Sequence, residues 1–414
     1  MNASSVARRG VLGARASVIA PTPEQVDTTQ KAGDARRPRR VLVLVTEDWF
    51  AASHFLPVLR ALDEAGYQVR VATRVDQKGE VLRAAGCALV PFNFERGDLR
   101  PVRDIGTAAR LLALLWRERP DAIHVIALKP ITLAALVYLL SPARHMIMHL
   151  TGVGYAGTGS AMPIRLVYGA VRALISGMLK LPSTWLMVEN PDDMAGLATP
   201  GASGPGRVTI LGGAGVDPAH FAVAPLAGNA VPRAAFVGRM VWTKGVDVLV
   251  EAHSRLLGCG VDLDLRLCGD PDTGNPRAIP GLTLEAWRRL PHVSLSGHVS
   301  DVRSVWRGAD IAVVPSRGGE GLPRAMLEAA ACGRPIIASD VPGCRYFVRD
   351  GVEGLLVPAE DPDALAAALA KLAGDRALRE AMGAAARARL MSGFTERHVI
   401  SAVQTSYAAL FAGD

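Results

Sequence analysis

Short apolar runs alternate with amphipathic stretches along the chain from residue 40 onward. Six apolar runs in the first half have the length and apolar content of buried strands. They are VLVLVT (41–46), QVRVAT (68–73), AIHVIA (122–127), HMIMHL (145–150), WLMVEN (185–190) and RVTIL (207–211). Apolar residues at helical spacing cover 53–66 and 107–118 between them. This alternation predicts a parallel sheet with helices on both faces.

The same alternation starts again after a span rich in Ala, Pro and Gly. A second set of strands is predicted there, with a helix at 244–257 after the first of them. These strands are 233–238, 263–269, 292–297, 310–316, 334–339 and 354–358. The sequence therefore predicts an α/β fold of two tandem doubly wound, Rossmann-like domains, whose ligands bind at the carboxyl ends of the strands.

Five parts of the chain follow from this pattern. They are a basic tail (1–39), a first domain (40–217), a linker (218–232), a second domain (233–395) and a C-terminal helix (396–414). The tail carries seven Lys or Arg residues but no apolar segment, so we expect it to be disordered and not a secretory signal. A transit peptide is the less favoured alternative. The helix at 396–411 is expected to pack back on the first domain.

The composition predicts a cytoplasmic globular protein, with 50% apolar and 21% charged residues among 414. No apolar run approaches the ~20 residues needed to span a bilayer. The five cysteines form no CxxC pair and are odd in number, which favours neither a disulfide framework nor a zinc site. His145 and His149 lack the glutamate of an HExxH motif, so we interpret them as structural or cleft residues and expect no metal.

The charge is distributed unevenly along the chain. Between Asp121 and Glu189 there is no acidic residue, but there are five basic ones. Such a region is expected to face an anionic partner. The chain has few aromatic residues and no helix dense in Lys or Arg, so an anionic membrane surface is favoured over nucleic acid. The apolar face predicted along 163–181 fits either an interfacial helix or, more often, a core helix with a basic rim.

The stretch HLTGVGYAGTGS (149–160) contains a GxGxxG pattern, which by itself is a weak signal for dinucleotide binding. A dinucleotide site needs these glycines after the first strand and an acidic residue about 20 positions later. Here they follow a later strand, and the next acidic residue is Glu189. An NAD site is therefore disfavoured, and we expect the loop either to let a ligand approach the backbone in the cleft or to be a plain flexible turn.

The strongest chemical signal is VVPSRGGEGLPRAMLEAAACG (313–333). A strand, a glycine loop and a helix start predict free N–H groups at Gly321 and Leu322 that can bind an anion. Glu320 and Glu328 stand eight residues apart, about 12 Å along a helix. They can hold hydroxyl groups of a ligand lying along the cleft. The alternative is that Glu320 caps the helix and Glu328 is a solvated charge.

A second loop supplies positive charge. In FVGRMVWTKG (236–245), Arg239 and Lys244 follow the carboxyl end of another predicted strand. Two cations at such a position can neutralise a diphosphate without a metal ion. Taken singly, an Arg and a Lys on a loop are usually solvated. Together with the anion site and the two carboxylates, they predict a site for a nucleotide-diphosphate sugar.

These motifs resemble the retaining glycosyltransferase family 4, the group 1 glycosyltransferases with the two-domain B-type fold. The resemblance rests on GR-x4-KG, on GGEGLPRAMLEA with its E-x7-E pair, and on ASDVPGCRYFVRDGVEGLLVP. It implies that Glu320 faces the donor sugar, Glu328 holds the ribose, and Arg239 and Lys244 bind the diphosphate. It also implies that the base stacks near Gly297 and His298, and that transfer occurs on the front face with retention and without a metal.

Motifs of the first domain look like a bacterial subgroup that extends polyprenyl-diphosphate-linked sugars. These motifs are HVIALKP (124–130), HLTGVGYAGT (149–158), VENPDD (188–193) and, in the second domain, GNPRAIP (274–280). The resemblance implies that the acceptor is bound by His124, Lys129, Thr151, Gly152, Gly154 and Tyr155. Thr151 stands where many family members carry a histidine, which puts a histidine-dependent role in doubt. His149 is a weak candidate for a substitute.

We therefore expect a metal-independent, retaining hexosyltransferase that needs no cofactor. It would move an N-acetylhexosamine or related hexose from a UDP-sugar to a polyprenyl-diphosphate-linked sugar, at the inner face of the cell membrane. The alternatives are a family 4 transferase with a soluble acceptor, a sugar-nucleotide epimerase of the same fold, and a catalytically silent nucleotide-sugar-binding protein. An epimerase would be expected to lack the paired motifs and to turn over donor without acceptor.

Overall fold

The computed structural model describes residues 37–94, 101–153, 162–197, 207–226, 228–272 and 274–413. Most of the predicted tail, residues 1–36, lies outside the described residues, as do Gly154 and Tyr155 of the predicted acceptor site.

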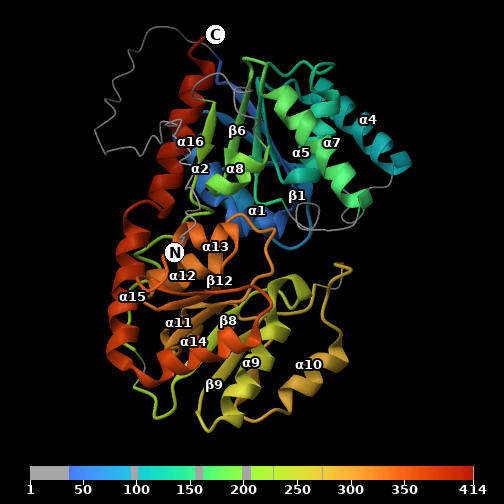
Figure 1. The fold of residues 1–414 in the computed structure, drawn as a ribbon. Coiled ribbons are helices and arrows are strands. Elements are labelled where there is room, and N and C mark those ends of the chain that lie inside the picture. The colour runs from blue at the N-terminus through green and yellow to red at the C-terminus, as the bar shows by residue number, and fades with distance from the viewer. Residues whose placement is uncertain are drawn as a thin grey trace, which may run out of the picture. The chain divides into compact units, whose positions relative to one another are not determined.

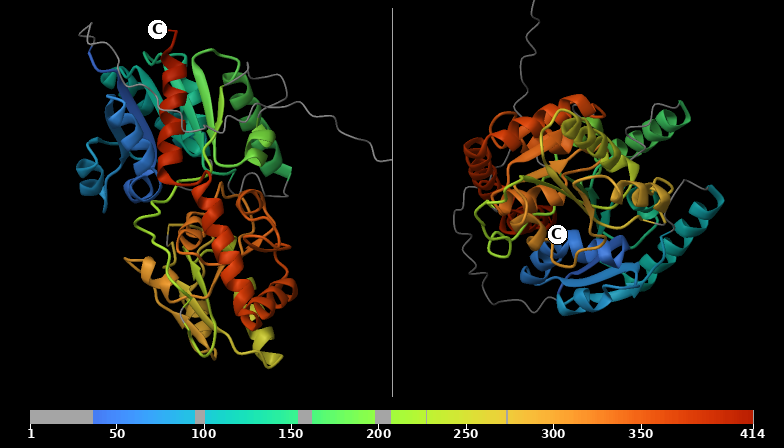
Figure 2. Two further views of the ribbon diagram at one scale, coloured as in Figure 1. Left: turned by 90° about the vertical axis from the view of Figure 1, so that its left-hand side faces the viewer. Right: turned by 90° about the horizontal axis from the view of Figure 1, so that it is seen from below.

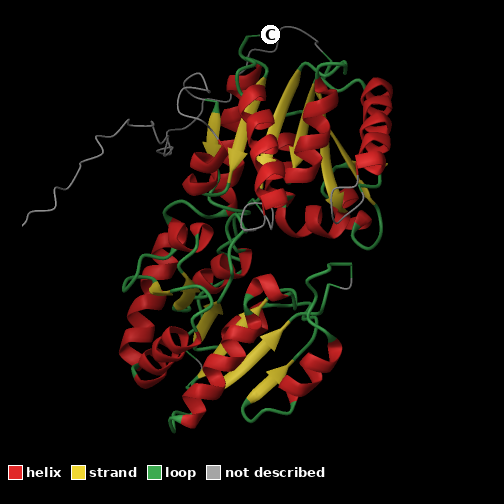
Figure 3. Ribbon diagram, turned by 45° about the vertical axis from the view of Figure 1, so that its right-hand side comes forward, coloured by secondary structure: helices red, strands yellow, loops and turns green. Residues whose placement is uncertain are grey.

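Seven parallel strands of the described chain form the first sheet, in the order β3-β2-β1-β4-β5-β6-β7 (Figure 3). The strands are β1 (Arg40–Glu47), β2 (Gln68–Arg74), β3 (Ala88–Pro91), β4 (Ala122–Ile126), β5 (His145–Leu150), β6 (Thr184–Val188) and β7 (Val208–Ile210). Strands β1, β4, β5 and β6 are buried along nearly their whole length because helices cover both faces of the sheet.

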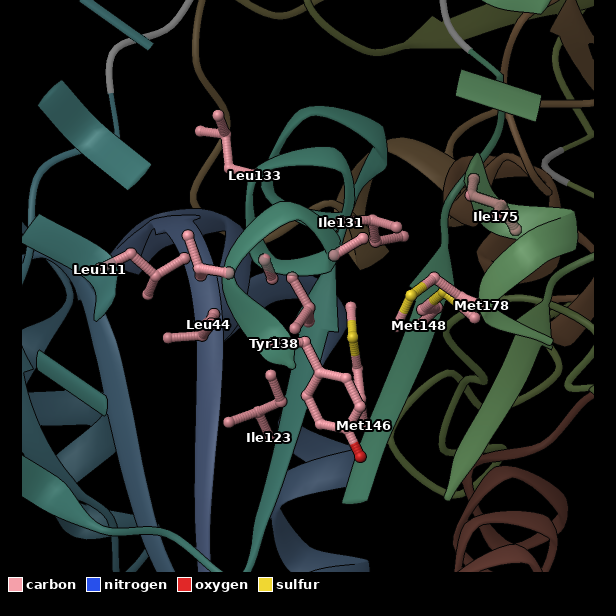
Figure 4. Packing of buried hydrophobic residues seen from close by; sticks show 14 of the residues in the cluster. Leu44, Leu111, Ile123, Ile131, Leu133, Tyr138, Met146, Met148, Ile175 and Met178 are labelled. Atoms are coloured by element: carbon pink, nitrogen blue, oxygen red, sulfur yellow. The ribbon is translucent and has the colours of Figure 1, made fainter. Parts of the chain in front are cut away.

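Each face of the first sheet has its own hydrophobic core. Helices α4 (Pro101–Glu118), α5 (Leu128–Tyr138) and α7 (Met162–Met178) cover one face, where Figure 4 shows Leu111, Ile131, Tyr138 and Ile175 packed over the strands. The opposite face is covered by α2 (Leu56–Glu64) and by the C-terminal helix α16 (Glu396–Phe411). The short helices α1 (Asp48–His54), α3 (Gly79–Ala84) and α8 (Pro191–Leu197) complete this domain.

Six parallel strands of the described chain form the second sheet, in the order β10-β9-β8-β11-β12-β13. They are β8 (Arg233–Val237), β9 (Asp264–Cys268), β10 (Val293–Leu295), β11 (Ile311–Val314), β12 (Ile336–Ser339) and β13 (Gly354–Val357). The helices around them are η1 (Trp242–Lys244), α9 (Val246–Gly258), α10 (Gly281–Arg288), α11 (Arg303–Arg307), α12 (Arg324–Ala331), α13 (Pro342–Phe347), α14 (Pro362–Gly374) and α15 (Arg376–Met391). The two doubly wound sheets confirm the predicted fold class.

Helix α16 follows the second domain in sequence but packs on the first sheet, beside α2 (Figure 1 and Figure 2). Its side chains Val399, Val403, Tyr407 and Phe411 belong to the same buried cluster as strand β1. The Tyr407 hydroxyl lies 3.0 Å from Nδ1 of His124 in β4. The first domain is therefore completed by residues that come almost 200 positions after β7.

Helix α7 resolves the alternative that its sequence left open. Val171, Ile175 and Met178 are buried in the core of the first domain, with Tyr168 and Leu174 packed against it. The buried part of the predicted apolar face is therefore a core face, because a doubly wound sheet has to be covered by the apolar sides of its own helices. Val167, which was predicted on the same face, is 40% exposed and lies outside this core.

Candidate functional site

Glu320 and Lys244 form the centre of the candidate site, at the carboxyl edge of the second sheet. Lys244 ends helix η1, and Glu320 lies in the loop between β11 and α12. The Nζ atom of Lys244 donates a hydrogen bond to Oε2 of Glu320, and the Ser316 hydroxyl donates to Oε1 at 2.6 Å. Both charged side chains remain partly exposed, 22% for Lys244 and 26% for Glu320. The structure thus brings together two residues that the sequence assigned to the donor.

A left-handed glycine holds this lysine close to strand β11. Gly245 follows Lys244 with a φ of +68°, a region that favours glycine. A β-carbon at this position would lie 1.9 Å from the carbonyl oxygen of Pro315, so the close approach of the two backbones also requires glycine. The close packing of Gly245 on Pro315 therefore places Lys244 beside the end of β11, where the loop that carries Glu320 begins.

The charges around Glu320 keep its carboxyl ionised. Burial alone would raise its pKa, but the charge and hydrogen bond of Lys244, the Ser316 hydroxyl and the charge of Arg239 hold the pKa below its ordinary value. The site therefore contains a carboxylate held beside two cations at neutral pH. Such cations can stabilise the negative charge that develops on a departing phosphate.

Arg239 lies near this pair but has its own partner. Its Nη1 atom donates a hydrogen bond of 2.6 Å to Asp272, and its side chain is 43% exposed. The guanidinium carbon lies 6.0 Å from the ring centre of Trp49, on helix α1 of the first domain. Among the described residues, no group of three or more His, Cys, Asp or Glu side chains is arranged to hold a metal ion.

The other predicted donor residues lie on neighbouring elements of the second domain. Glu328 is buried in α12 and accepts a hydrogen bond of 2.9 Å from Arg324. Burial raises the pKa of Glu328, against the opposing charge and hydrogen bond of Arg324. Gly297 and His298 follow β10, where the Gly297 carbonyl accepts a hydrogen bond of 2.7 Å from Gly269.

The N–H groups of Gly321 and Leu322 are not free, which corrects the anion site predicted from the sequence. The Gly321 N–H donates to the carbonyl oxygen of Thr151 at 3.1 Å, and the Leu322 N–H donates to Oε2 of Glu189 at 2.7 Å. Both acceptors come from the first domain. The sequence shows where a helix begins, but it does not show which distant residue is folded against that helix start.

Thr151 and Gly152, which were predicted to bind the acceptor, also contact this loop. A β-carbon on Gly152, whose φ is +107°, would lie 2.5 Å from Gly319 O and from Gly321 N. The first two residues after β5 are thus packed directly against the backbone around Glu320. Gly152 of the GxGxxG pattern is therefore required because a side chain at this position would collide with the backbone of the other domain.

His124 is placed differently from the prediction. It is fully buried in β4, with Nδ1 3.0 Å from the Tyr407 hydroxyl and Nε2 3.1 Å from Nδ1 of His149. Burial and His149 hold the pKa of His124 well below its ordinary value. This environment corrects the predicted acceptor contact, because both ring nitrogens are used inside the core. Lys129, at the start of α5, forms an ion pair of 3.1 Å with Asp104.

Helix α1 adds a residue that the sequence interpretation missed. His54 shares a hydrogen bond of 2.6 Å with the Ser53 hydroxyl. Burial and the nearby charges of Arg324, Lys244 and Arg239 lower the pKa of His54 to about 3. A neutral imidazole from the first domain therefore lies near positively charged side chains of the second domain, among them Lys244 and Arg239. Its only signal in the sequence was its place soon after the first strand, where doubly wound domains position functional loops.

Comparison with known protein families finds one matching segment in each domain. Residues 40–184 match the model described as "Glycosyl transferase 4-like", and residues 231–375 match "Glycosyl transferases group 1". The chain is 38% identical over 137 residues to a phosphatidyl-myo-inositol mannosyltransferase of Mycobacterium leprae. That match covers 33% of this chain and 36% of the relative, so it spans about a third of either protein.

Solved structures share the fold across nearly the whole chain. Sucrose-phosphate synthase from Thermosynechococcus elongatus has a TM-score of 0.72 at 20% identity, covering 91% of this chain and all of that one. Anabaena HepE in complex with UDP and glucose has a TM-score of 0.70 at 16% identity, covering 89% and 99%. These likenesses confirm the two-domain B-type fold predicted from the sequence. The chain thus carries a glycosyl transferase 4-like domain followed by a group 1 glycosyl transferase domain.

Proposed function

We propose that this protein is a retaining, metal-independent glycosyltransferase that moves a sugar from a UDP-sugar to a polyprenyl-diphosphate-linked sugar. The observation that carries the proposal is the contact of Lys244 with Glu320, with Ser316 on the other carboxylate oxygen. The contact joins the two motifs that the sequence assigned to donor binding. The domain families over 40–184 and 231–375 support transfer of a glycosyl group.

The chemistry follows from where the charges lie. Lys244 and Arg239 would neutralise the diphosphate of the donor as its bond to the sugar breaks, in the role that cations have at other phosphate leaving groups. Glu320 would face the sugar, and Glu328 would hold the ribose hydroxyls. The acceptor hydroxyl would attack from the face that the diphosphate leaves and would give its proton to the departing phosphate oxygen, so UDP is released and the anomeric configuration is retained.

Binding of the nucleotide tests this proposal first. UDP at a hundred times its dissociation constant should stabilise the protein by about 2.7 kcal/mol, enough to raise the melting temperature measurably. We expect a shift with UDP that persists in EDTA, and smaller shifts with GDP and ADP. A shift with NAD and none with UDP would contradict the proposal and restore a dinucleotide function for the GxGxxG pattern.

Product analysis separates the candidate reactions. Transfer of a labelled sugar to a polyprenyl-diphosphate-linked sugar is the expected result. Transfer to a phosphoinositol headgroup is the second candidate, because the Mycobacterium leprae relative is named for such an acceptor. Transfer to a soluble sugar would leave the enzyme class intact and change the acceptor. Conversion of donor without any acceptor would indicate an epimerase instead.

A surface on the first domain supports an acceptor held in an anionic membrane. On the outer layer formed by α4, α5 and α7, eight large apolar side chains are exposed. They are Ile105, Trp116, Leu136, Leu139, Leu140, Met162, Leu166 and Val167. Exposed cations lie on and beside the same helices. They are Arg103, Arg110, Arg117, Arg119, Arg144, Arg165, Arg172 and Lys180. We call these sixteen residues the basic apolar layer.

Acidic side chains offset only a small part of this charge. Within the described parts of residues 103–188, the three carboxylates are mostly covered and paired. Asp104 contacts Lys129, Glu118 contacts Arg70 and Arg117, and Asp121 contacts Arg37. Exposed apolar groups mixed with an excess of exposed cations suit the surface of an anionic bilayer. No helix within the described residues has the length and apolar character to cross a bilayer.

Charge reversal in the basic apolar layer should weaken membrane binding. The variant Arg165→Glu/Arg172→Glu is expected to lose at least about fivefold affinity for each cation in vesicles containing phosphatidylglycerol, since each contributes ~1 kcal/mol at such a surface. Co-sedimentation measures this loss. The matched control Arg288→Glu/Arg289→Glu reverses two exposed arginines on and beside α10 and should bind as wild type. Equal losses in both variants would show that only net charge matters.

A further inference from the structure

Two adjacent residues of the first domain hold the loop that carries Glu320. Oε2 of Glu189 accepts the hydrogen bond of 2.7 Å from the Leu322 N–H. Nδ2 of Asn190 donates a hydrogen bond of 2.8 Å to the carbonyl oxygen of Gly321. Together with the bond from Gly321 N to Thr151 O, three hydrogen bonds fix the two residues that directly follow Glu320. Glu189 and Asn190 themselves follow the carboxyl end of β6.

This contact is close enough to fix the loop in one position. A β-carbon on Gly321 would lie 2.2 Å from Oε2 and 2.9 Å from Cβ of Glu189. A β-carbon on Gly343, at the start of α13, would lie 2.0 Å from the Gly321 carbonyl oxygen. Gly321 is therefore enclosed by the first domain on one side and by its own domain on the other. Displacement of Glu189 would remove one wall of this enclosure.

The charge state of Glu189 suits a contact near another carboxylate. Burial raises its pKa to about 8; the Leu322 hydrogen bond opposes this shift, and the charges of Asp193 and Glu320 add to it. Asp193 lies on α8, and burial raises its pKa to about 6. The neutral form of Glu189 is therefore favoured at pH 7. A neutral carboxyl can lie beside ionised Glu320 without repelling it.

We propose that Glu189 is a positioning residue for the transfer reaction, which holds the Glu320 loop in place from the opposite domain. The inference rests on the proposed function, because it needs Glu320 to act on the donor. Glu189 itself would touch neither substrate. Its carboxyl would fix the backbone at Leu322, and through it the direction in which Glu320 and its partner Lys244 face. Asn190 would support the same loop through Gly321.

A pH dependence follows from the same geometry. The Glu189 carboxyl has a higher pKa in its contact with Leu322 than in water, so it binds its proton more tightly in that contact. The contact is therefore strongest at low pH and weakens as pH rises from the ordinary value of 4.5 toward 8. Ionised Glu189 would face Glu320 and Asp193 as a like charge. Transfer by the wild-type protein should accordingly decline as the pH approaches and passes about 8.

The test compares Glu189→Gln with Glu189→Ala. Glutamine keeps a neutral acceptor for the Leu322 N–H, so its kcat at pH 7 should stay within about twofold of wild type, without the alkaline decline attributed to Glu189. Alanine removes the acceptor, and kcat should fall at least about tenfold with little change in the KM for donor, because a small misplacement of catalytic groups is costly. Glu285→Ala, on exposed α10, is the control and should match wild type.

Hydrogen exchange gives a readout that does not depend on activity. A peptide spanning residues 316–326 should exchange faster in Glu189→Ala and at the wild-type rate in Glu189→Gln. Unchanged exchange in Glu189→Ala, or a glutamine variant as impaired as the alanine variant at pH 7, would overturn the proposal. A wild-type protein that transfers no sugar would refute the proposed function, while the exchange result would still decide whether Glu189 holds the loop.

Discussion

Lys244→Ala is expected to reduce sugar transfer by at least about a hundredfold while leaving the fold intact. The variant removes the cation that contacts Glu320 and that would face the diphosphate, and loss of one such group from a preorganised site costs roughly this factor. Lys244 is partly exposed on a short helical turn, so its truncation should leave no cavity in either core. Initial rates at saturating donor and acceptor, with melting temperatures, measure both effects.

Two companion variants make this result specific. Glu320→Ala should be impaired to a similar extent, because it removes the other member of the pair. Lys371→Ala changes an exposed lysine on α14 and should transfer at the wild-type rate. Near-normal turnover in Lys244→Ala or in Glu320→Ala would show that the site has been assigned to the wrong residues.

Gly152→Ala is expected to separate the two domains at the point where they touch, and to lower kcat by about a hundredfold. Its new methyl group would lie 2.5 Å from two backbone atoms of the Glu320 loop, Gly319 O and Gly321 N, neither of which can rotate away as a side chain would. The φ of +107° at this position adds strain for any residue other than glycine. A shift of about 1 Å at the loop is enough for such a loss.

The matched control for this variant is Gly169→Ala. Gly169 lies in helix α7, where a β-carbon would meet nothing within 4 Å. Alanine is the better helix former there, so both stability and transfer should be kept or slightly improved. If Gly152→Ala transferred sugar as fast as Gly169→Ala, the contact between Gly152 and the loop would not be needed for activity.

Local sequence patterns predicted most of the fold because most strands are short, largely apolar runs, but the short edge strand β3 was not predicted. The helix predicted over 53–66 was less accurate, since the structure divides this region into α1 and α2 around Phe55. Phe55 is buried, so apolar spacing continues across the break and conceals it. Helix α5 is apolar on nearly every side and shows no amphipathic pattern, which explains why no helix was predicted there.

The candidate site was only partly accessible from the sequence. The motifs that contain Lys244 and Glu320 could be recognised because glycine and charged residues in a loop at the end of a strand indicate a ligand site. The positions of Glu189 and of Gly152 depend on how two domains are docked, and no local pattern encodes that. His124 shows the opposite error. It stands in a motif that resembles an acceptor site, but the alternation of β4 turns its ring toward α16.

The position of α16 has a consequence for how the protein is made. A ribosome synthesises the strands of the first sheet early, yet one face of that sheet is covered only in part, by α2, until residues 396–411 emerge. Until then the hydroxyl partner of His124 is absent and Val41 and Val43 lack part of their cover. The half of the protein that is translated first therefore cannot complete its core until the last helix is made, and a nascent chain stalled within the second domain would expose an incomplete core.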